Sequence, residues 1–144
     1  AALLALSQTT ATIPVVDYSF PRIAAGSWSY VAVPGGSEAR FTDATATIRL
    51  TIHCTKATRR VSISHASAAP ASSMFVWTSS ATRTLPAVFD PKGMRVTADL
   101  AANDPLLDAI AFSRGRVAVS LPGMSALVVP AWVDPARAVE DCRI

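Results

Sequence analysis

Charged residues and histidines are scarce in this chain of 144 residues, and long apolar runs are missing. Charged side chains make up 16% of the sequence and hydrophobic residues 51%, so a largely disordered chain is excluded. The net charge of +3 comes from scattered lysines and arginines. They form no dense basic stripe with interleaved aromatics, which argues against a nucleic-acid partner. No apolar run is long enough for a transmembrane span.

Motifs for cofactor binding and nucleophilic catalysis are missing as well. The chain has no phosphate-binding P-loop, no G-x-G-x-x-G fingerprint and no G-x-S-x-G nucleophile elbow. Its two histidines, His53 and His65, and its two cysteines, Cys54 and Cys142, lack the spacing of a metal site. We therefore expect no catalytic residue, no cofactor and no metal.

The chain opens with AALLALSQTT, an apolar run followed by small polar residues. This pattern is typical of the end of a secretory signal peptide, so we expect an exported protein. We assign residues 1–25 to a leader remnant with an extended lead, and residues 26–144 to one domain. In an exported protein, Cys54 and Cys142 are expected to form a disulfide, whereas in the cytosol they would be two buried thiols.

Alternating hydrophobicity predicts about eight short strands separated by turns. The clearest strand is TATIRLTIHCT, in which the inward positions are Ile48, Leu50, Ile52 and Cys54. MFVWTS is apolar on both faces, so it is either central or covered on its outer face. RTLPAVF is interrupted by Pro86 and is expected at a sheet edge. In MRVTADL we expect Met94 to point inward. The three tryptophans, Trp28, Trp77 and Trp132, are expected in the core or packed on the disulfide, not as a platform for a ligand.

DPLLDAIAFSRG is predicted to form the one full helix of the chain. Asp104 is a good N-cap, and Pro105 suits the first helical position. An apolar stripe follows at Leu106, Leu107, Ile110 and Ala111. Arg114 is expected in the last turn, and Gly115 is expected to close the helix.

The tail DPARAVEDC repeats the Asp-Pro start and is expected to form a short helical turn that carries Cys142. The strands and the lack of strand–helix alternation predict a mainly β fold. We expect an antiparallel β-sandwich or a barrel-like sheet, with the helix capping one open end of the core.

Four arginines are the candidate binding residues. Arg49 and Arg95 occupy outward strand positions, and Arg114 and Arg116 flank the predicted helix end. If the four side chains converge, they form an anion-binding face. Otherwise they belong to a solvated surface, in which Arg114 binds free carbonyls of the helix and Arg116 pairs with Asp99 on a neighbouring strand.

Several segments carry a family resemblance, namely CTKATRRVSI, MFVWTSSATRTLPA, DPLLDAIAFSRGR, LVVPAW and VEDCR. Over residues 28–143 the chain resembles a group of small exported proteins of alphaproteobacteria, of the sphingomonad type, that carry a signal or lipoprotein leader. In outline it is also similar to envelope proteins of the invasion-associated locus B type, which is an analogy of fold. The resemblance implies a periplasmic or outer-membrane-associated protein and transfers no activity. Ser7 stands where a lipidated cysteine would be expected.

These observations lead us to expect a non-enzymatic envelope protein that binds a protein or another envelope component, or supports the cell surface. We expect a monomer or a weak homodimer. The alternatives are a small periplasmic hydrolase-like enzyme and an inhibitor or ligand-binding module. A deep pocket with converging polar groups would favour the enzyme, and an exposed apolar or arginine-rich face would favour the binder.

Overall fold

The fold is a β-sandwich in which two antiparallel sheets enclose the core. The computed structural model describes residues 17–144, so the predicted leader remnant in residues 1–16 lies outside the described residues. The described part contains ten strands and two helices. The predicted fold class is confirmed, with more strands than the eight or so expected.

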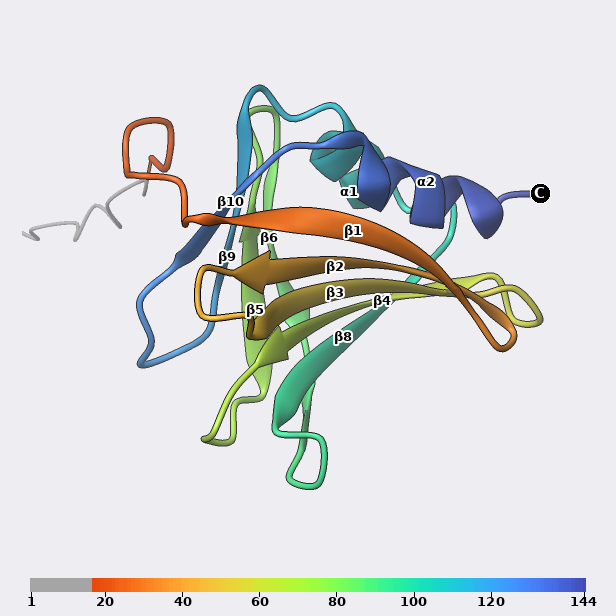
Figure 1. The fold of residues 1–144 in the computed structure, drawn as a ribbon, viewed down its shortest axis with the longest axis horizontal. Coiled ribbons are helices and arrows are strands. Elements are labelled where there is room, and N and C mark those ends of the chain that lie inside the picture. The colour runs from red at the N-terminus through yellow and green to blue at the C-terminus, as the bar shows by residue number, and fades with distance from the viewer. Residues whose placement is uncertain (1–16) are drawn as a thin grey trace, which may run out of the picture.

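The larger sheet has six strands in the order β1-β2-β3-β4-β8-β7. Their bounds are β1 (Gly26–Val33), β2 (Gly36–Asp43), β3 (Ile48–Thr55), β4 (Arg60–Ala66), β8 (Arg95–Ala101) and β7 (Val88–Asp90). The smaller sheet has four strands in the order β10-β9-β5-β6. Their bounds are β10 (Leu127–Pro130), β9 (Arg116–Ser120), β5 (Ser73–Trp77) and β6 (Thr82–Pro86). Strands of the smaller sheet run across those of the larger one (Figure 1).

Two helices cover the part of the larger sheet that extends beyond the smaller one (Figure 1). They are α1 (Pro105–Ala111) and α2 (Val133–Asp141). Helix α2 packs against β1, β2, β3 and α1. The sequence predicted that α1 alone caps the open end of the core. Both helices cap it, and α2 makes the contacts with β1, β2 and β3. No helix within residues 17–144 is long and apolar enough to cross a membrane.

The inward positions of the strands build the core. Leu50, Ile52 and Cys54 are buried as predicted, but Ile48 is 46% exposed. The expectation for Ile48 is wrong because the register between β2 and β3 shifts at Phe41 and leaves Ile48 opposite Thr42, on the outer face. An extra residue of this kind moves the side chains beyond it to the opposite face of the sheet.

Met94 also differs from its expected inward position. It is 48% exposed and has a φ of +53°, in the left-handed region. It therefore lies in the turn before β8, and alternation starts only at the strand itself, where Val96, Ala98 and Leu100 are buried.

RTLPAVF forms two edge strands where one was expected. β6 ends at Pro86 and lies at the edge of the smaller sheet, while β7 starts at Val88 and lies at the edge of the larger sheet. Ala87 crosses between the sheets, and its N–H donates to the Ser72 carbonyl at 3.0 Å. Proline cannot donate to a ladder, so Pro86 marks the point where the chain leaves the first sheet.

Helix α1 begins as predicted and ends earlier. The Asp104 carboxylate accepts from the Leu106 N–H at 2.9 Å, and Leu106, Leu107 and Ile110 are buried. The helix ends at Ala111, so the expectation that Arg114 lies in its last turn is wrong. Gly115 has the left-handed φ of +75° but lies in the loop and does not close the helix.

A pair of serines explains the early end of α1. The hydroxyl of Ser113 donates to the Arg116 carbonyl at 2.5 Å and accepts from the Ser79 N–H at 2.9 Å. The Ser79 hydroxyl in turn accepts from the Arg114 N–H at 2.8 Å. These side chains bind backbone groups that a longer helix would have used, a competition typical of serine.

Helix α2 is more than the short turn that was expected. It has nine residues against seven in α1 and starts at Val133, before the Asp-Pro pair. Trp132 is its N-cap residue and is 45% exposed, so the core position predicted for Trp132 is wrong. Trp28 and Trp77 are buried, as predicted.

The segment before β1 docks on the outer face of the smaller sheet. Tyr18 meets Trp77 edge-on at 6.0 Å between ring centroids, and Ile23 packs on the same cluster. The Ala24 N–H donates to the Val128 carbonyl at 2.8 Å. This covering segment explains why MFVWTS is apolar on both faces, one of the two interpretations that the sequence left open.

We predict that Leu107→Ala lowers the free energy of unfolding by about 2–5 kcal/mol, because Leu107 is fully buried in the core. Urea unfolding would measure the change. Phe112→Ala, at a neighbouring side chain that is 81% exposed, is the control and should change stability by less than about 0.5 kcal/mol. Equal effects of the two substitutions would contradict the core assignment.

His65 is a fully buried histidine on the inner face of β4. Its Nδ1 donates to the Ala66 carbonyl at 2.6 Å, and its Nε2 has no hydrogen-bond partner among the described residues. Burial lowers the pKa of His65 below the ordinary 6.5, because the charged form would lose its hydration.

This burial predicts a loss of stability in mild acid. The unfolded chain takes up a proton at His65 near the ordinary pKa of 6.5, and the folded chain does not, so the free energy of unfolding should fall as the pH drops from about 7.5 to about 5.5. Denaturant unfolding at several pH values measures the slope. His65→Leu should flatten it, and His53→Gln, at a partly exposed histidine, should not. An unchanged slope in His65→Leu would contradict this account.

Candidate functional site

The outer face of the larger sheet carries a row of long cationic and short hydroxyl side chains. The register places Arg40 of β2 opposite Thr51 of β3, and Thr51 opposite Ser64 of β4. Ser64 is followed by Thr97 of β8, and the two hydroxyls are 2.8 Å apart. Thr51 and Ser64 are each only 8% exposed, because longer neighbours overhang them.

Three arginines surround these hydroxyls. Arg40, Arg49 and Arg95 line one hollow of about 420 Å³, together with Thr51 and Ser64. We call this site the arginine furrow (Arg40, Arg49, Arg95, Thr51 and Ser64). The small side chains in the middle of the sheet lie between long arginines at its sides, and that difference in length creates the hollow.

The furrow continues into a second hollow of about 520 Å³, with which it shares Arg49, Ala66 and Met94. Met94 and Met124 are partly exposed at its rim. The two hollows together form one elongated surface. Guanidinium groups line the first hollow, and the thioether side chains of Met94 and Met124 lie at the second. Such a shape suits a ligand with an anionic group and an apolar flank.

Glu38 holds Arg40 and His53 beside the furrow. Its carboxylate accepts from Arg40 Nε at 2.6 Å and contacts His53 Nδ1 at 2.9 Å. Partial burial alone would raise the pKa of Glu38, but the hydrogen bonds from Arg40 and His53 outweigh it and lower that pKa. Glu38 thus stays charged and orients Arg40 without closing the hollow.

Asp43 holds Arg49 from a tight turn. Its Oδ1 accepts from the N–H and hydroxyl of Thr45 and from the N–H of Thr47, at 2.6–3.1 Å. The hydroxyl of Thr45 is the main reason that the pKa of Asp43 falls to about 2. Arg49 Nη1 lies 3.4 Å from Asp43 Oδ2, a long contact that leaves most of the guanidinium donors free.

Arg95 is the arginine of the furrow that forms no ion pair with any residue of the described chain. In the register it lies between Ala66 of β4 and Asp90 of β7, and the small Ala66 side chain leaves the space on the furrow side open. Its five donors are available to a bound acceptor.

The structure brings together only two of the four arginines singled out in the sequence. Arg49 and Arg95 meet in the furrow, whereas Arg114 and Arg116 lie by the smaller sheet. The Arg116 guanidinium donates to the Pro21 carbonyl. The expected pair of Arg116 with Asp99 is wrong because β8 and β9 belong to different sheets. Asp99 pairs instead with Arg60 at 2.9 Å.

Sequence reasoning missed Arg40, the third arginine of the furrow, and also its two hydroxyl residues, Thr51 and Ser64. The strand EARF alternates, and this alternation places Arg40 outward, but nothing local shows that β2 pairs with the strand of Arg49. No three histidine, cysteine or acidic side chains gather as metal ligands within residues 17–144. His53 and Cys54 point to opposite faces of β3, and His65 lies in the interior.

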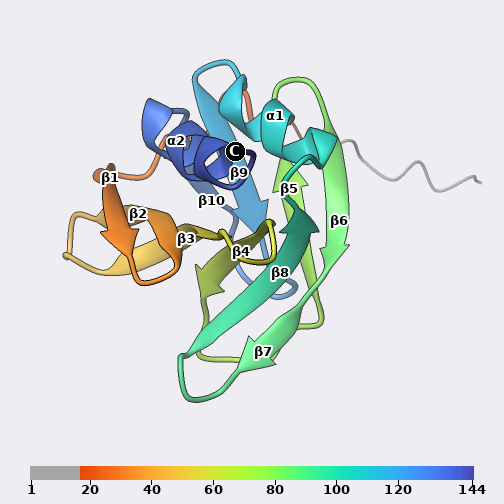
Figure 2. The same cartoon turned by 90° about the vertical axis from the view of Figure 1, so that its right-hand side faces the viewer.

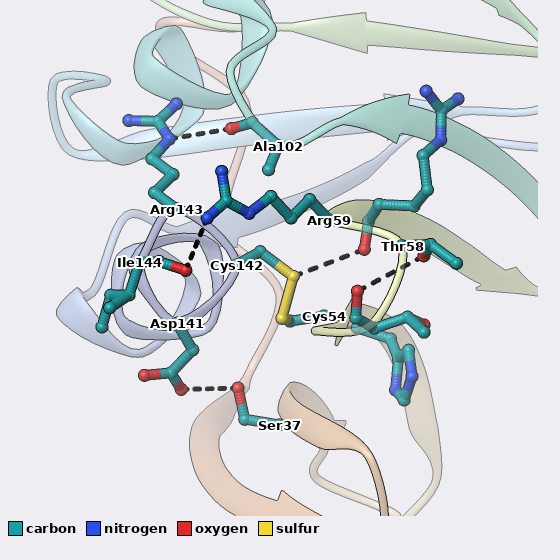
Figure 3. Close-up of a disulfide and its surroundings, with 12 residues drawn as sticks. Ser37, Cys54, Thr58, Arg59, Ala102, Asp141, Cys142, Arg143 and Ile144 are labelled. Carbon is teal, nitrogen blue, oxygen red and sulfur yellow. Dashed lines mark hydrogen bonds between the residues drawn. A yellow bond between two sulfur atoms is a disulfide. The ribbon is translucent and has the colours of Figure 1, made fainter.

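The predicted disulfide joins Cys54 of β3 to Cys142 at the end of α2, with 5.6 Å between the Cα atoms (Figure 3). Both residues are buried. Sγ of Cys142 lies 3.5 Å from the Arg60 carbonyl oxygen, a packing contact since a disulfide sulfur has no proton to donate.

The two neighbours of Cys142 in the chain also attach α2 to the rest of the domain. We call these three residues the C-terminal lock (Asp141, Cys142 and Arg143). Asp141 accepts from the hydroxyls of Ser37, at 2.6 Å, and Tyr30, and these hydrogen bonds, that of Ser37 first, lower the pKa of Asp141. Arg143 donates to the Ala102 carbonyl at 2.8 Å and to Asp108 of α1 at 2.7 Å.

Comparisons with family models, with curated proteins and with solved structures find no match. The furrow and the lock are therefore interpreted from their own geometry.

We predict that replacing Cys54 and Cys142 together by serine lowers the free energy of unfolding by about 4–5 kcal/mol, because the disulfide closes a loop with a sequence separation of 88. Urea unfolding of the oxidised protein and the double variant measures this. Intact mass before and after reduction and alkylation checks the bond itself. Cysteines that alkylate readily in the untreated native protein would contradict it.

Proposed function

We propose that this chain is an exported, non-enzymatic binding module that holds an anionic group of a cell-envelope component in the arginine furrow. The observation that carries the proposal is the convergence of Arg40, Arg49 and Arg95 on one hollow floored by Thr51 and Ser64. Guanidinium groups and hydroxyls are the donors that proteins use for carboxylates and phosphates.

The charges of the furrow favour an anion over a cation or a neutral ligand. Three guanidinium groups and one carboxylate, that of Glu38, line the hollow. Glu38 already accepts from Arg40 and His53, whereas Arg95 has no ionic partner in the described part of the chain. A bound carboxylate or phosphate would satisfy Arg95 and the free donors of Arg49.

The same groups give little support to an enzyme. Catalysis of acid–base type uses a group whose pKa is moved towards neutrality, and the carboxyl pKa values of Glu38 and Asp43 are both lowered. The hydroxyl of Ser64 contacts that of Thr97, and a nucleophile would need a base there. Binding is therefore the better-supported alternative.

Export is supported by the covalent chemistry of the fold. The Cys54–Cys142 disulfide is the cross-link of the domain, and such bonds persist in oxidising compartments. The family resemblance points the same way, towards the periplasm or the outer membrane. An anionic envelope component would be at hand in both places.

We predict that inorganic phosphate and glucuronate, tested separately, bind the furrow and that glucose does not. Chemical-shift titration of the full chain would follow binding of each anion and show whether the furrow prefers a phosphate or a carboxylate. Affinity should fall as the salt concentration is raised, because exposed charges are screened within about 8–10 Å at moderate ionic strength. Binding that persists unchanged at high salt would contradict an arginine-driven site.

Substitutions test the location of the site. Arg95→Ala should weaken binding by about tenfold, the loss typical of one charge-assisted contact, and should leave the melting temperature unchanged because Arg95 supports no ion pair in residues 17–144. Arg114→Ala is the matched control, since Arg114 is exposed and lies by the other sheet. Equal losses in the two variants would show nonspecific attraction to the net positive charge.

A further inference from the structure

Four strands lie at sheet edges in the described part of the chain, and three of them carry features that prevent pairing with another strand. β6 contains Arg83 and Pro86. β7 has only three residues and ends at Asp90. β10 has four residues and ends at Pro130, and its Val128 carbonyl already accepts from Ala24. Charge, proline, shortness and covering are the usual protections of an edge.

Within residues 17–144, β1 has none of these protections. Its eight residues, GSWSYVAV, include no charged side chain and no proline. Figure 2 shows β1 at the outer side of the larger sheet, away from the smaller sheet. Apart from the ladder with β2, no backbone hydrogen bond in the described chain involves residues 27–33. A long and uncharged edge of this kind is a template for strand addition.

The hairpin geometry indicates which backbone groups are free. Val33 and Gly36 flank a two-residue turn, so they form a hydrogen-bonded pair, and such pairs alternate along an antiparallel ladder. The N–H and C=O groups that point to the open edge therefore belong to Trp28, Tyr30 and Ala32.

The side chains around this edge hold it extended and accessible. Trp28 Nε1 donates to the Pro130 carbonyl at 2.7 Å, and the Tyr30 hydroxyl donates to Asp141. Both anchors lie on the inner face and leave the edge itself open. Ser27, Ser29 and Ala32 are exposed and small, so another strand can approach closely.

We propose that β1 pairs with β1 of a second copy of this chain, antiparallel about a twofold axis, to form one continuous sheet across a homodimer. Two identical edges that pair antiparallel are self-complementary, because each free N–H of β1 meets a free carbonyl of β1 in the second copy. Each chain carries a net charge of +3, yet β1 is uncharged. On β2, Glu38 and Arg40 pair at 2.6 Å. Arg137 of α2 lies 3.9 Å from the centroid of the Tyr30 ring, and the Asp141 carboxylate that accepts from Tyr30 offsets its charge, so no unbalanced charge lies beside the edge.

This inference does not rest on the anion site, although Arg40 borders both, since it lies opposite Ser29 in the β1–β2 register. Sedimentation of the full chain from about 1 μM to about 1 mM should show a monomer–dimer equilibrium, a range that corresponds to weak specific association. Ser29→Lys places two cations beside the twofold axis, and Ala32→Pro removes one free N–H of the edge. Each should weaken the dimer by about tenfold or more.

Thr84→Lys on the exposed edge strand β6 is the matched control and should leave the dimer unchanged. Amide hydrogen exchange adds a local readout: exchange at Trp28, Tyr30 and Ala32 should slow as the dimer forms. A chain that stays monomeric to about 1 mM would overturn the proposal. A dimer that both β1 variants leave intact, or that Thr84→Lys weakens equally, would also overturn it.

Discussion

The fold depends on one attachment, that of α2 to the larger sheet. The smaller sheet does not cover the whole inner face of the larger one (Figure 1). The remainder of that face, on β1, β2 and β3, packs against α2. Helix α2 buries that remainder through Ala138 and Val139, while Cys142 bonds covalently to Cys54. A helix of nine residues has little stability of its own, so tertiary packing and the disulfide must supply it. Each residue of the segment EDCR has a contact of this kind. Glu140 Oε1 lies 3.4 Å from Arg143 Nη1, and Asp141, Cys142 and Arg143 form the C-terminal lock.

The furrow depends on a local irregularity in the same sheet. One additional residue in β3 at the end of its pairing with β2 turns Ile48 outward and leaves Arg49 beside the Asp43 turn. In a regular ladder Arg49 would lie opposite Thr42 and Ile48 would face inward, so the bulge adds Ile48 to the lining of the hollow. The arginine furrow therefore arises from the register of four strands, β2, β3, β4 and β8, and one bulge, and β-bulges are common beside functional sites.

Features that rest on neighbouring residues were predictable from the sequence. The alternation of β3 from Leu50 to Cys54 and the Asp104 cap follow from hydrophobic period and local chemistry, whereas the sequence left open whether MFVWTS is central or covered, and it is both. Pairings between distant segments were not predictable. Nothing near Arg116 shows that its strand joins the other sheet, and nothing near Trp132 shows that it caps a helix at the surface. Arg40 was overlooked for the same reason, because its neighbour Thr51 comes from strand pairing and not from sequence proximity.

The position of the disulfide has a mechanical consequence. Cys54 lies at the end of β3 and Cys142 at the end of α2, so the bond encloses β4 to β10 and both helices within one covalent ring. A force that pulls residue 17 away from residue 144 passes along β1, β2 and β3 and then through the sulfur atoms directly to the last residues. The smaller sheet lies outside this covalent path and is loaded only through the segment before β1 that docks on it. Under tension, the domain can lose its first three strands while the rest keeps a closed covalent outline, and only reduction of the bond allows the chain to extend fully.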